Sequence, residues 1–283
     1  MITAFVILNY NSANLTIRLA KMVEKYSAID YVVLVDNCST DNSYEELKKI
    51  KSKKINIYET DRNGGYSFGN NYGAKVCKNL GVDIMFIANP DVVVKEEDIN
   101  TLLGAFENSD YSLLTGLQYE IDGSLGQPPI QVRYSYMDDL KDCFIIGRKI
   151  FASNHGKDVD TGSSIQDMNM FRGSFFGVRL DDFVSVEGFD EEFFLYCEER
   201  VLSKRFEERH KKIGIVPDAR YDHMHSVSIS KAYKQRYSRM KLLYDSRYLY
   251  NVKYNKIGIG KRLLMLFAMK LSLFEYFIFD GVM

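Results

Sequence analysis

Three short polar segments in the first hundred residues hold the side chains that could do chemistry. The clearest follows the apolar run 84–88, which ends in Asn89-Pro90-Asp91. Because proline lacks a backbone donor and stops a strand, Asp91 is predicted to lie at the carboxyl end of a buried strand. Open α/β sheets bind ligands at that edge. A carboxylate there could hold a divalent cation on a diphosphate, since hard cations prefer oxygen ligands.

The other two polar segments are predicted at the same edge of the sheet. Segment 9–12 follows the apolar run 2–8, and segment 36–41 follows the run 31–35. Together with the glycine-rich turn 63–66, they indicate a nucleotide site. The Gly-x-Gly-x-x-Gly fingerprint of dinucleotide-binding proteins and the Walker lysine loop are both absent. The site is therefore expected to bind a nucleotide in another way.

Helical patterns alternate with these strands. This alternation predicts βαβ units, a parallel sheet and right-handed crossovers. Ser43 and Glu46 have the spacing of a capping box at a helix start. After residue 94 the alternation weakens. Further strands are expected at 55–58, 113–119, 171–178, 213–216 and 221–225, and helices at 13–26, 68–80, 198–211 and from 230 onward.

Composition narrows the class of protein. The 283 residues are 46% hydrophobic, enough for one large α/β domain with an appendage. With 37 basic and 38 acidic residues, no net positive charge points to nucleic acid. Four cysteines without a CxxC pair, and an N-terminus without a signal peptide, suggest reduced thiols in the cytoplasm. The cysteines are Cys38, Cys77, Cys143 and Cys197.

The C-terminal stretch 261–279 is strongly apolar. Lys270 and Glu275 interrupt it, so a membrane span is not expected. An amphipathic helix in a membrane interface is one interpretation, with Lys261 and Arg262 facing anionic headgroups at the inner face of the cell membrane. A core helix and half of a dimer contact are the alternatives, and composition alone does not separate them.

Taken together, the motifs resemble the large inverting family of nucleotide-sugar glycosyltransferases with the GT-A fold, family 2. They are Asn9-Tyr10-Asn11, the segment 35–41, Asn63-Gly64-Gly65-Tyr66 with Gly69 and Asn71, Asn89-Pro90-Asp91, the segment 172–176 and the segment 188–199. The resemblance covers residues 2–228. It implies a mostly parallel sheet flanked by helices, in a catalytic domain 1–228 with a nucleotide-binding half 1–94 and an acceptor half 95–228. Residues 229–283 would form a helical C-terminal extension.

The resemblance also implies a donor site. Asp36 or Asn37 would accept the imide N–H of uracil or thymine. Asp91 resembles the last acid of the family's D-x-D motif, while Asn89 replaces the first and leaves one carboxylate for Mg²⁺ or Mn²⁺. Asn-Pro-Asp is seen in relatives that transfer rhamnose or related deoxysugars. The full set of implied donor residues is Asn9, Tyr10, Asn11, Asp36, Asn37, Asp41, Asn63, Gly64, Gly69, Asn71, Asn89, Asp91 and Arg205.

A second set of residues is implied for the reaction itself. One carboxylate must take a proton from the acceptor hydroxyl, and Glu199 is favoured over its neighbour Glu198. Helix N-terminal acids favoured by the macrodipole are the alternative interpretation of this pair. His223 or His225 would be a further metal ligand. Gly173, Phe194 and Tyr196 are expected to contact the acceptor.

The expected function is transfer of a sugar, with rhamnose as one candidate, from a dTDP- or UDP-sugar to a glycan or polyprenyl-linked acceptor for the cell surface. The sequence is also compatible with a homo-oligomer. One alternative is a sugar-nucleotide-binding protein without turnover, because Val201 and Asn89 replace acids of the relatives. A nucleotidyltransferase would need a basic glycine-rich loop after the first strand, which segment 9–12 does not supply. Tyrosines interleaved with Lys and Arg after residue 230 would suit single-stranded nucleic acid, but the net charge of −1 argues against it.

Overall fold

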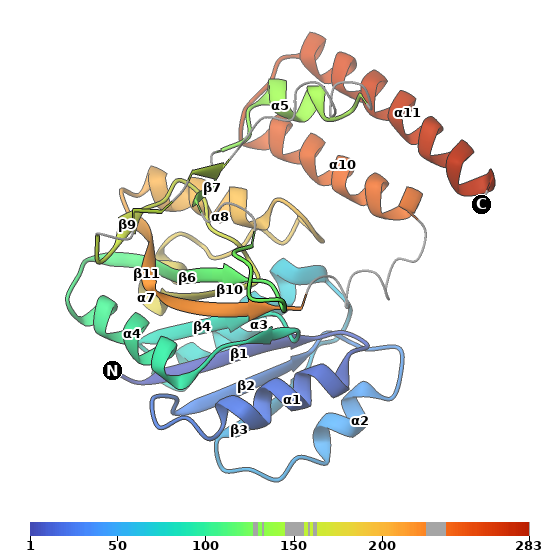
Figure 1. Cartoon of the computed structure of the whole chain (residues 1–283). Coiled ribbons are helices and arrows are strands. Elements are labelled where there is room, and N and C mark those ends of the chain that lie inside the picture. The colour runs from blue at the N-terminus through green and yellow to red at the C-terminus, as the bar shows by residue number, and fades with distance from the viewer. Residues whose placement is uncertain are drawn as a thin grey trace.

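A mixed sheet forms the centre of the molecule. The computed structural model describes residues 1–126, 130–131, 133–144, 156–157, 159–160, 163–224 and 236–282. In spatial order, the strands of this part are β3 (Ile55–Glu59), β2 (Tyr31–Asp36), β1 (Thr3–Asn9), β4 (Ile84–Ala88), β10 (Phe175–Arg179), β6 (Tyr111–Tyr119), β11 (Lys212–His223) and β5 (Val92–Val93), with β9 (Gln166–Asp167) paired to β11. Figure 1 shows the sheet crossing the middle of the protein.

The first half of the sheet is parallel, as the alternation of strands and helices predicts. Strands β3, β2, β1 and β4 run in the same direction. The second half is mixed: β10 is antiparallel to both of its neighbours, and β5 is antiparallel to β11. The two strands expected at 213–216 and 221–225 are one strand, β11, with an irregularity between Val216 and Arg220. An interrupted strand looks like two short strands when only the residue pattern is available.

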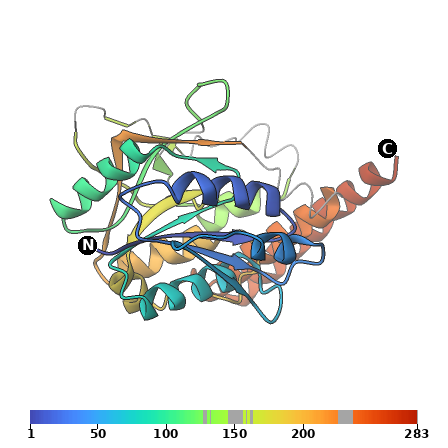
Figure 2. The ribbon, with the colours of Figure 1, turned by 90° about the horizontal axis from the view of Figure 1, so that it is seen from below.

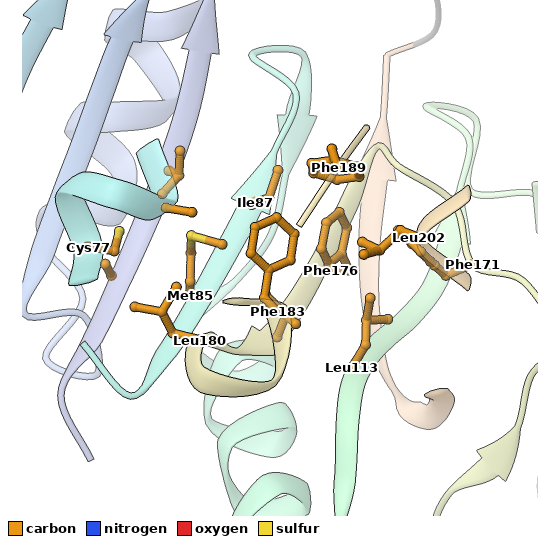
Figure 3. Close-up of a cluster of buried hydrophobic side chains, with 14 of the residues drawn as sticks. Cys77, Met85, Ile87, Leu113, Phe171, Phe176, Leu180, Phe183, Phe189 and Leu202 are labelled. Atoms are coloured by element: carbon orange, nitrogen blue, oxygen red, sulfur yellow. The ribbon is translucent and has the colours of Figure 1, made fainter. Parts of the chain in front are cut away.

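Helices cover both faces of the sheet. On one face, α1 (Ala13–Val23), α2 (Ser43–Lys48) and α4 (Glu96–Glu107) pack on apolar residues of the strands. The other face is covered by α3 (Gly65–Asn79), α7 (Leu180–Ser185) and α8 (Glu198–Glu208). Figure 3 shows this second core, where Met85 and Ile87 of β4 lie near Phe176 of β10 and Phe183 of α7. Burying each such side chain contributes about 1.5–3 kcal/mol to the stability of the folded state.

Two helix starts differ from the expectation. Ser43 is the first residue of α2, and the residue before the helix is Asn42. The Ser43 hydroxyl accepts a hydrogen bond from the backbone of Ala13 instead of closing a capping box, so that prediction is wrong. Glu46 accepts from the Asn42 amide. Helix α3 begins at Gly65, three residues before the expected start.

Three helices form a separate layer beyond the sheet. They are α5 (Tyr136–Lys141), α10 (Arg236–Lys253) and α11 (Ile259–Val282), and they share a small apolar core. Strands β7 (Ile130–Gln131) and β8 (Gly156–Lys157) precede and follow α5 in the chain and pair with each other in antiparallel orientation. The expected domain boundary at 228 falls outside the described residues. Figure 1 places this layer at the top of the molecule. Within the described residues, every helix is too short or too polar to cross a membrane.

A buried ionic cluster joins this layer to the sheet domain. Asp139 of α5 is fully buried, and both of its oxygens accept from Arg200 of α8 at 2.9 Å. The amide of Asn251, in α10, donates to the same carboxylate at 2.8 Å. Arg247 lies 3.4 Å away. One carboxylate therefore connects α5, α8 and α10.

Candidate active site

Asp91 and His223 meet at the end of the sheet. Strand β5 begins directly after Asp91 and pairs with the last residues of β11, so that Val92 lies opposite His223. The backbone N–H of Met224 also donates to the Asp91 carbonyl at 3.0 Å. These contacts bring His223 Nε2 to 3.2 Å from Asp91 Oδ1, with both side chains largely buried. The expected position of Asp91 at a strand end is confirmed.

The Asp91 carboxylate of this pair suits Mg²⁺ or Mn²⁺, which prefer oxygen ligands, while the His223 imidazole is a less common ligand of these ions. One carboxylate oxygen and one imidazole nitrogen at this separation can face the same ion. Among the residues that the structure describes, no group of three His, Cys, Asp or Glu side chains lies together, and His225 is outside them. Mg²⁺ is often held by one or two carboxylates, with substrate phosphates and water completing its shell. Two protein ligands are therefore enough.

A second cluster lies between the ends of β1 and β2. Asp36 is fully buried, and its carboxylate accepts from the Asn9 amide at 2.6 Å. The same carboxylate accepts from the backbone and the hydroxyl of Ser39, at 2.9 and 2.7 Å. Ser39 in turn accepts from the Asn11 backbone at 3.0 Å. The prediction that segments 9–12 and 36–41 lie together is confirmed.

These bonds fix the loop after β2 and the turn before α3. Asn37, also buried, donates to Asn63 Oδ1 and to the Gly65 carbonyl, each at 3.0 Å. The Asn11 side chain donates to the Thr40 hydroxyl at 3.0 Å. Thr40 and Asp41 are exposed at the loop tip. The buried Asn9 and Asn37 amides and the Asp36 carboxylate thus fix the conformation of the loop after β2, whose tip is polar and exposed to solvent.

The Glu199 carboxylate is held by a glycine of a different segment. The backbone N–H of Gly173 donates to Glu199 Oε1 at 3.2 Å. The Gly173 carbonyl accepts from the Tyr66 hydroxyl at 2.7 Å, and the Tyr66 backbone donates to the Phe194 carbonyl at 2.8 Å. Burial raises the pKa of Tyr66 well above its usual value, with the charges of Glu199 and then Glu198 adding to the effect. Tyr66 is therefore a neutral donor here.

Asp91 and Glu199 are linked through one short segment. The backbone N–H of Asn89, two residues before Asp91, donates to the Ser174 carbonyl at 2.8 Å. The next residue back, Gly173, holds Glu199. Because β10 follows this segment and is antiparallel to β4, its amino end lies beside the carboxyl end of β4. Acids from distant parts of the chain are thus brought to one edge of the sheet.

Glu198 differs from its neighbour. Its side chain is only 4% exposed, and Oε2 has no hydrogen-bond partner among the described residues. Burial raises the pKa of Glu198 well above its usual value, and the charge of Glu199 raises it further. Tyr196 and Cys197 both have left-handed backbone conformations, which turn the chain into α8 and direct Glu198 inward. Glu198 is buried, whereas Glu199 is partly exposed and its carboxylate is held by Gly173, so Glu199 is the better candidate base.

Comparison with known proteins shows the family and the fold of the chain. The sequence profile described as Glycosyl transferase family 2 matches residues 4–176, more than half of the chain. The chain belongs to glycosyltransferase family 2. Rhamnosyltransferase WbbL of Escherichia coli (strain K12) is 26% identical over 206 residues, covering 69% of this transferase and 76% of WbbL. Low-salt glycan biosynthesis hexosyltransferase Agl10 of Haloferax volcanii is 28% identical over 114 residues, covering 40% of this chain and 35% of Agl10.

Solved structures establish the GT-A fold of the transferase. GalNAc-T7 with UDP, GalNAc and Mn²⁺ superposes with a TM-score of 0.62 at 12% identity, over 97% of this chain and 56% of GalNAc-T7. S. aureus TarS 1–349 in complex with UDP-GlcNAc gives 0.58 at 13% identity, over 96% of this chain and 80% of TarS 1–349. The chain thus spans about half of GalNAc-T7 and about a third of Agl10. The resemblance read from the motifs is confirmed at the level of family and fold.

Three implied donor residues of the transferase have internal contacts in this structure. The Asn71 amide donates to the Phe189 carbonyl and to Glu191, at 2.9 and 3.0 Å. The Arg205 guanidinium donates to backbone carbonyls 186–188. A Cβ on Gly69 would lie 2.2 Å from Leu8, so this glycine lets α3 approach β1. The contacts that Asn71, Arg205 and Gly69 make in this structure are with other parts of the protein. Their contact with the donor stays a prediction.

One of the three implied acceptor residues contacts Glu199, and a second is hydrogen bonded to Tyr66. Gly173 touches Glu199 directly. Phe194 is partly exposed, and its carbonyl accepts from Tyr66 next to Gly65, which has φ +84°. A Cβ at Gly65 would lie 2.0 Å from that carbonyl, so only glycine permits this approach. Tyr196, partly exposed, lies just before α8.

Two residues that organise the site of this transferase were not among the implied set. Ser39 binds both Asp36 and Asn11, and Tyr66 joins the start of α3 to Gly173. Tyr66 could have been found from the sequence, because it directly follows two glycines at the start of a helix. Ser39 looks like an ordinary turn residue, because serine is common in turns. Only its three-dimensional partners distinguish it.

Proposed function

We propose that this chain is an inverting, divalent-metal-dependent glycosyltransferase that moves a sugar from a nucleotide diphosphate to a growing glycan. The observation that carries the proposal is the link between Asn89 and Glu199 through residues 173–174. It brings a candidate cation ligand and a candidate base to one edge of the sheet. A single displacement needs these two functions on opposite sides of the anomeric carbon.

The donor is proposed to be a dTDP- or UDP-sugar. Asp36 has no exposed surface, and each of its oxygens already accepts an internal hydrogen bond. We therefore expect Asp36 to hold the loop in shape while the exposed Thr40 and Asp41 and the partly exposed Asn11 face the nucleoside. TarS was solved with UDP and with UDP-GlcNAc, which supports a nucleotide-sugar donor. Rhamnose is supported by Asn-Pro-Asp and by the name of WbbL.

Asp91 and His223 are the residues that would hold Mg²⁺ or Mn²⁺. When bound, such an ion offsets the negative charge that grows on the leaving diphosphate. The Mn²⁺ in the GalNAc-T7 structure supports a divalent cation for this fold. The buried backbone around Asp91 keeps its carboxylate at the strand end.

Glu199 is proposed as the general base. Its Oε1 accepts from the Gly173 N–H, which fixes the carboxylate and leaves Oε2 to take the acceptor proton. The acceptor oxygen then bonds to the anomeric carbon as the bond to the diphosphate oxygen breaks. The electron pair leaves with the nucleoside diphosphate, and the proton stays on Glu199. One displacement inverts the anomeric centre without a covalent intermediate.

The acceptor is proposed to be a lipid-linked glycan. Apolar side chains are exposed along α11, which supports work beside a membrane surface. The name of Agl10, a glycan biosynthesis hexosyltransferase, supports a glycan product. Peripheral contact through residues 261–279 would bring the enzyme to a polyprenyl-linked acceptor.

A screen of nucleotide sugars by thermal shift, with Mg²⁺ or Mn²⁺ and with EDTA, tests the proposal. A donor at a hundredfold excess over its Kd raises stability by about 2.7 kcal/mol, enough to rank donors. Release of nucleoside diphosphate from the best donor then tests turnover. The alternative of a binding protein without turnover is favoured by Val201, which lies in an apolar cluster where relatives have an acid. Tight donor binding without nucleotide release, with every acceptor tried, would support that alternative.

A further inference from the structure

The outer surface of α11 is mostly apolar from Ile259 to Ile278. Met265, Ala268, Met269, Ser272 and Tyr276 face inward and are buried. The opposite side exposes nine large apolar residues. These are Ile259, Leu263, Leu264, Leu266, Phe267, Leu271, Phe274, Phe277 and Ile278. At 3.6 residues per turn they occupy an arc about 160° wide, which is called the α11 outer face below.

We infer that the α11 outer face docks on an anionic phospholipid bilayer, with the helix lying in the plane of the interface. The inference extends the proposed function, because it identifies the surface from which a lipid-linked acceptor would be supplied. The helix has 24 residues, about 36 Å of length, yet it contains Lys261, Arg262, Lys270 and Glu275 and is not apolar enough to span a membrane.

Charge selects lipid over a second copy of the chain. Residues 236–282 contain nine Lys or Arg and three Asp or Glu. Lys241, Arg247 and Lys253 are ion-paired with acidic residues of the protein, so the charge on the α11 outer face itself is that of Lys270. The exposed Lys270 lies within the arc of the α11 outer face, where its long stem can lie along apolar groups while the ammonium reaches a phosphate. Two such faces packed on each other would bring like charges together. Anionic headgroups instead complement them, at about 1 kcal/mol for each basic residue near the surface.

Hydrogen bonds and a buried ion pair connect α11 to α8, the helix that carries Glu199. The Tyr244 and Ser272 hydroxyls hydrogen bond at 2.8 Å between α10 and α11. Asp139 then joins α10 to Arg200, which directly follows Glu199 on α8. Figure 1 shows α11 as the outermost helix, and Figure 2 shows its C-terminal end extending past the rest of the molecule. A docked α11 would thus hold the active site at a fixed height above the lipid.

Vesicle sedimentation of the full chain tests the inference without donor or acceptor. Vesicles of phosphatidylcholine that contain phosphatidylglycerol are compared with vesicles of pure phosphatidylcholine, so that the two differ in negative surface charge. We expect strong binding to the anionic vesicles, and a loss of about tenfold or more for the double variant Phe267→Glu/Phe274→Glu. Lys270→Glu should lower binding to anionic vesicles only. Ile121→Glu is the matched control, since Ile121 is 74% exposed on the sheet domain, and it should bind normally.

Light scattering measures the oligomeric state of the chain in solution and so distinguishes lipid binding from self-association as the role of the α11 outer face. A monomer that binds anionic vesicles supports the inference. A dimer that the Phe267→Glu/Phe274→Glu variant breaks, together with no vesicle binding by the native chain, would overturn it. Nucleoside diphosphate release with a water-soluble acceptor is measured in parallel without vesicles. That release tests the proposed transfer alone, so either claim can fail while the other stands.

Discussion

The backbone N–H of Gly173 lies 3.2 Å from Glu199 Oε1, and a Cβ added to Gly173 would lie 2.7 Å from that oxygen. The three heavy atoms nearest to such a Cβ all belong to the Glu199 side chain, whose far end can rotate away. A side chain at position 173 would therefore displace the candidate base with little strain on the fold. This glycine positions the carboxylate.

Gly173→Ala should lower the transfer rate by about tenfold to a hundredfold, because a carboxylate moved by about 1 Å is no longer aligned with the acceptor. Its melting temperature should stay close to that of the native chain. Gly104→Ala is the control: nothing lies within 4 Å of its Cβ, and it should leave transfer unchanged. Equal rates for Gly173→Ala and the native chain would show that Glu199 does not need this contact.

Asp91→Asn and His223→Ala should each weaken donor binding by about tenfold in Mn²⁺, about 1.4 kcal/mol, because each removes a ligand of the cation. In EDTA the variants and the native chain should bind donor alike. Calorimetry in both buffers measures this difference. His210→Ala, at an exposed histidine after α8, is the matched control. Metal-independent donor binding by the native chain would remove the assignment of Asp91 and His223.

Glu198→Gln should stabilise the protein at neutral and higher pH. The folded chain holds the Glu198 proton more tightly than the unfolded chain, because burial raises its pKa. Stability is therefore lost as pH rises above the unfolded value of about 4.5, by up to about 1.4 kcal/mol per pH unit until the folded pKa is reached. Glutamine removes this loss, so the variant and the native chain should be equally stable near pH 4 and diverge above it. Urea unfolding across pH measures the difference, and parallel curves would contradict a raised pKa for Glu198.

Asp139→Asn should destabilise the chain by about 3–5 kcal/mol, since it leaves the buried Arg200 without its carboxylate. Asp142→Asn is the control. Asp142 also pairs with an arginine, Arg247 at 3.0 Å, but it is partly exposed, so its loss should cost less than about 1 kcal/mol. Chemical unfolding separates the two, and similar losses would show that Asp139 is not the main connection between α8 and α10.

The local pattern predicts the first half of the fold well. Strands β1, β2 and β4 are short apolar runs closed by polar residues, and parallel strands place those closings at one edge. Residues such as Asn9 and Asp36 could therefore be grouped before their contacts were seen. The antiparallel β10 was not predictable in this way, because its direction depends on pairing with β4 across more than eighty residues of chain.

Roles that depend on distant partners could not be predicted from local sequence. Ser43 and Glu46 have the spacing of a capping box, but Ser43 is engaged by Ala13 of another helix. Arg205 carries the family's basic position, yet its guanidinium binds carbonyls 186–188. Asp139 shows no motif at all, and its importance comes from arginines 61 and 108 positions away in the chain.

The choice of Glu199 as base is tested most directly by comparing Glu199→Gln with Glu198→Gln in single-turnover transfer, with donor Kd measured on the same samples. Glu199→Gln should lose about 10²–10⁴ in rate while it keeps the native donor affinity, because a missing base affects the chemical step and not donor binding. Glu198→Gln should transfer at a rate near the native one. Full transfer by Glu199→Gln, or a loss confined to Glu198→Gln, would contradict the account.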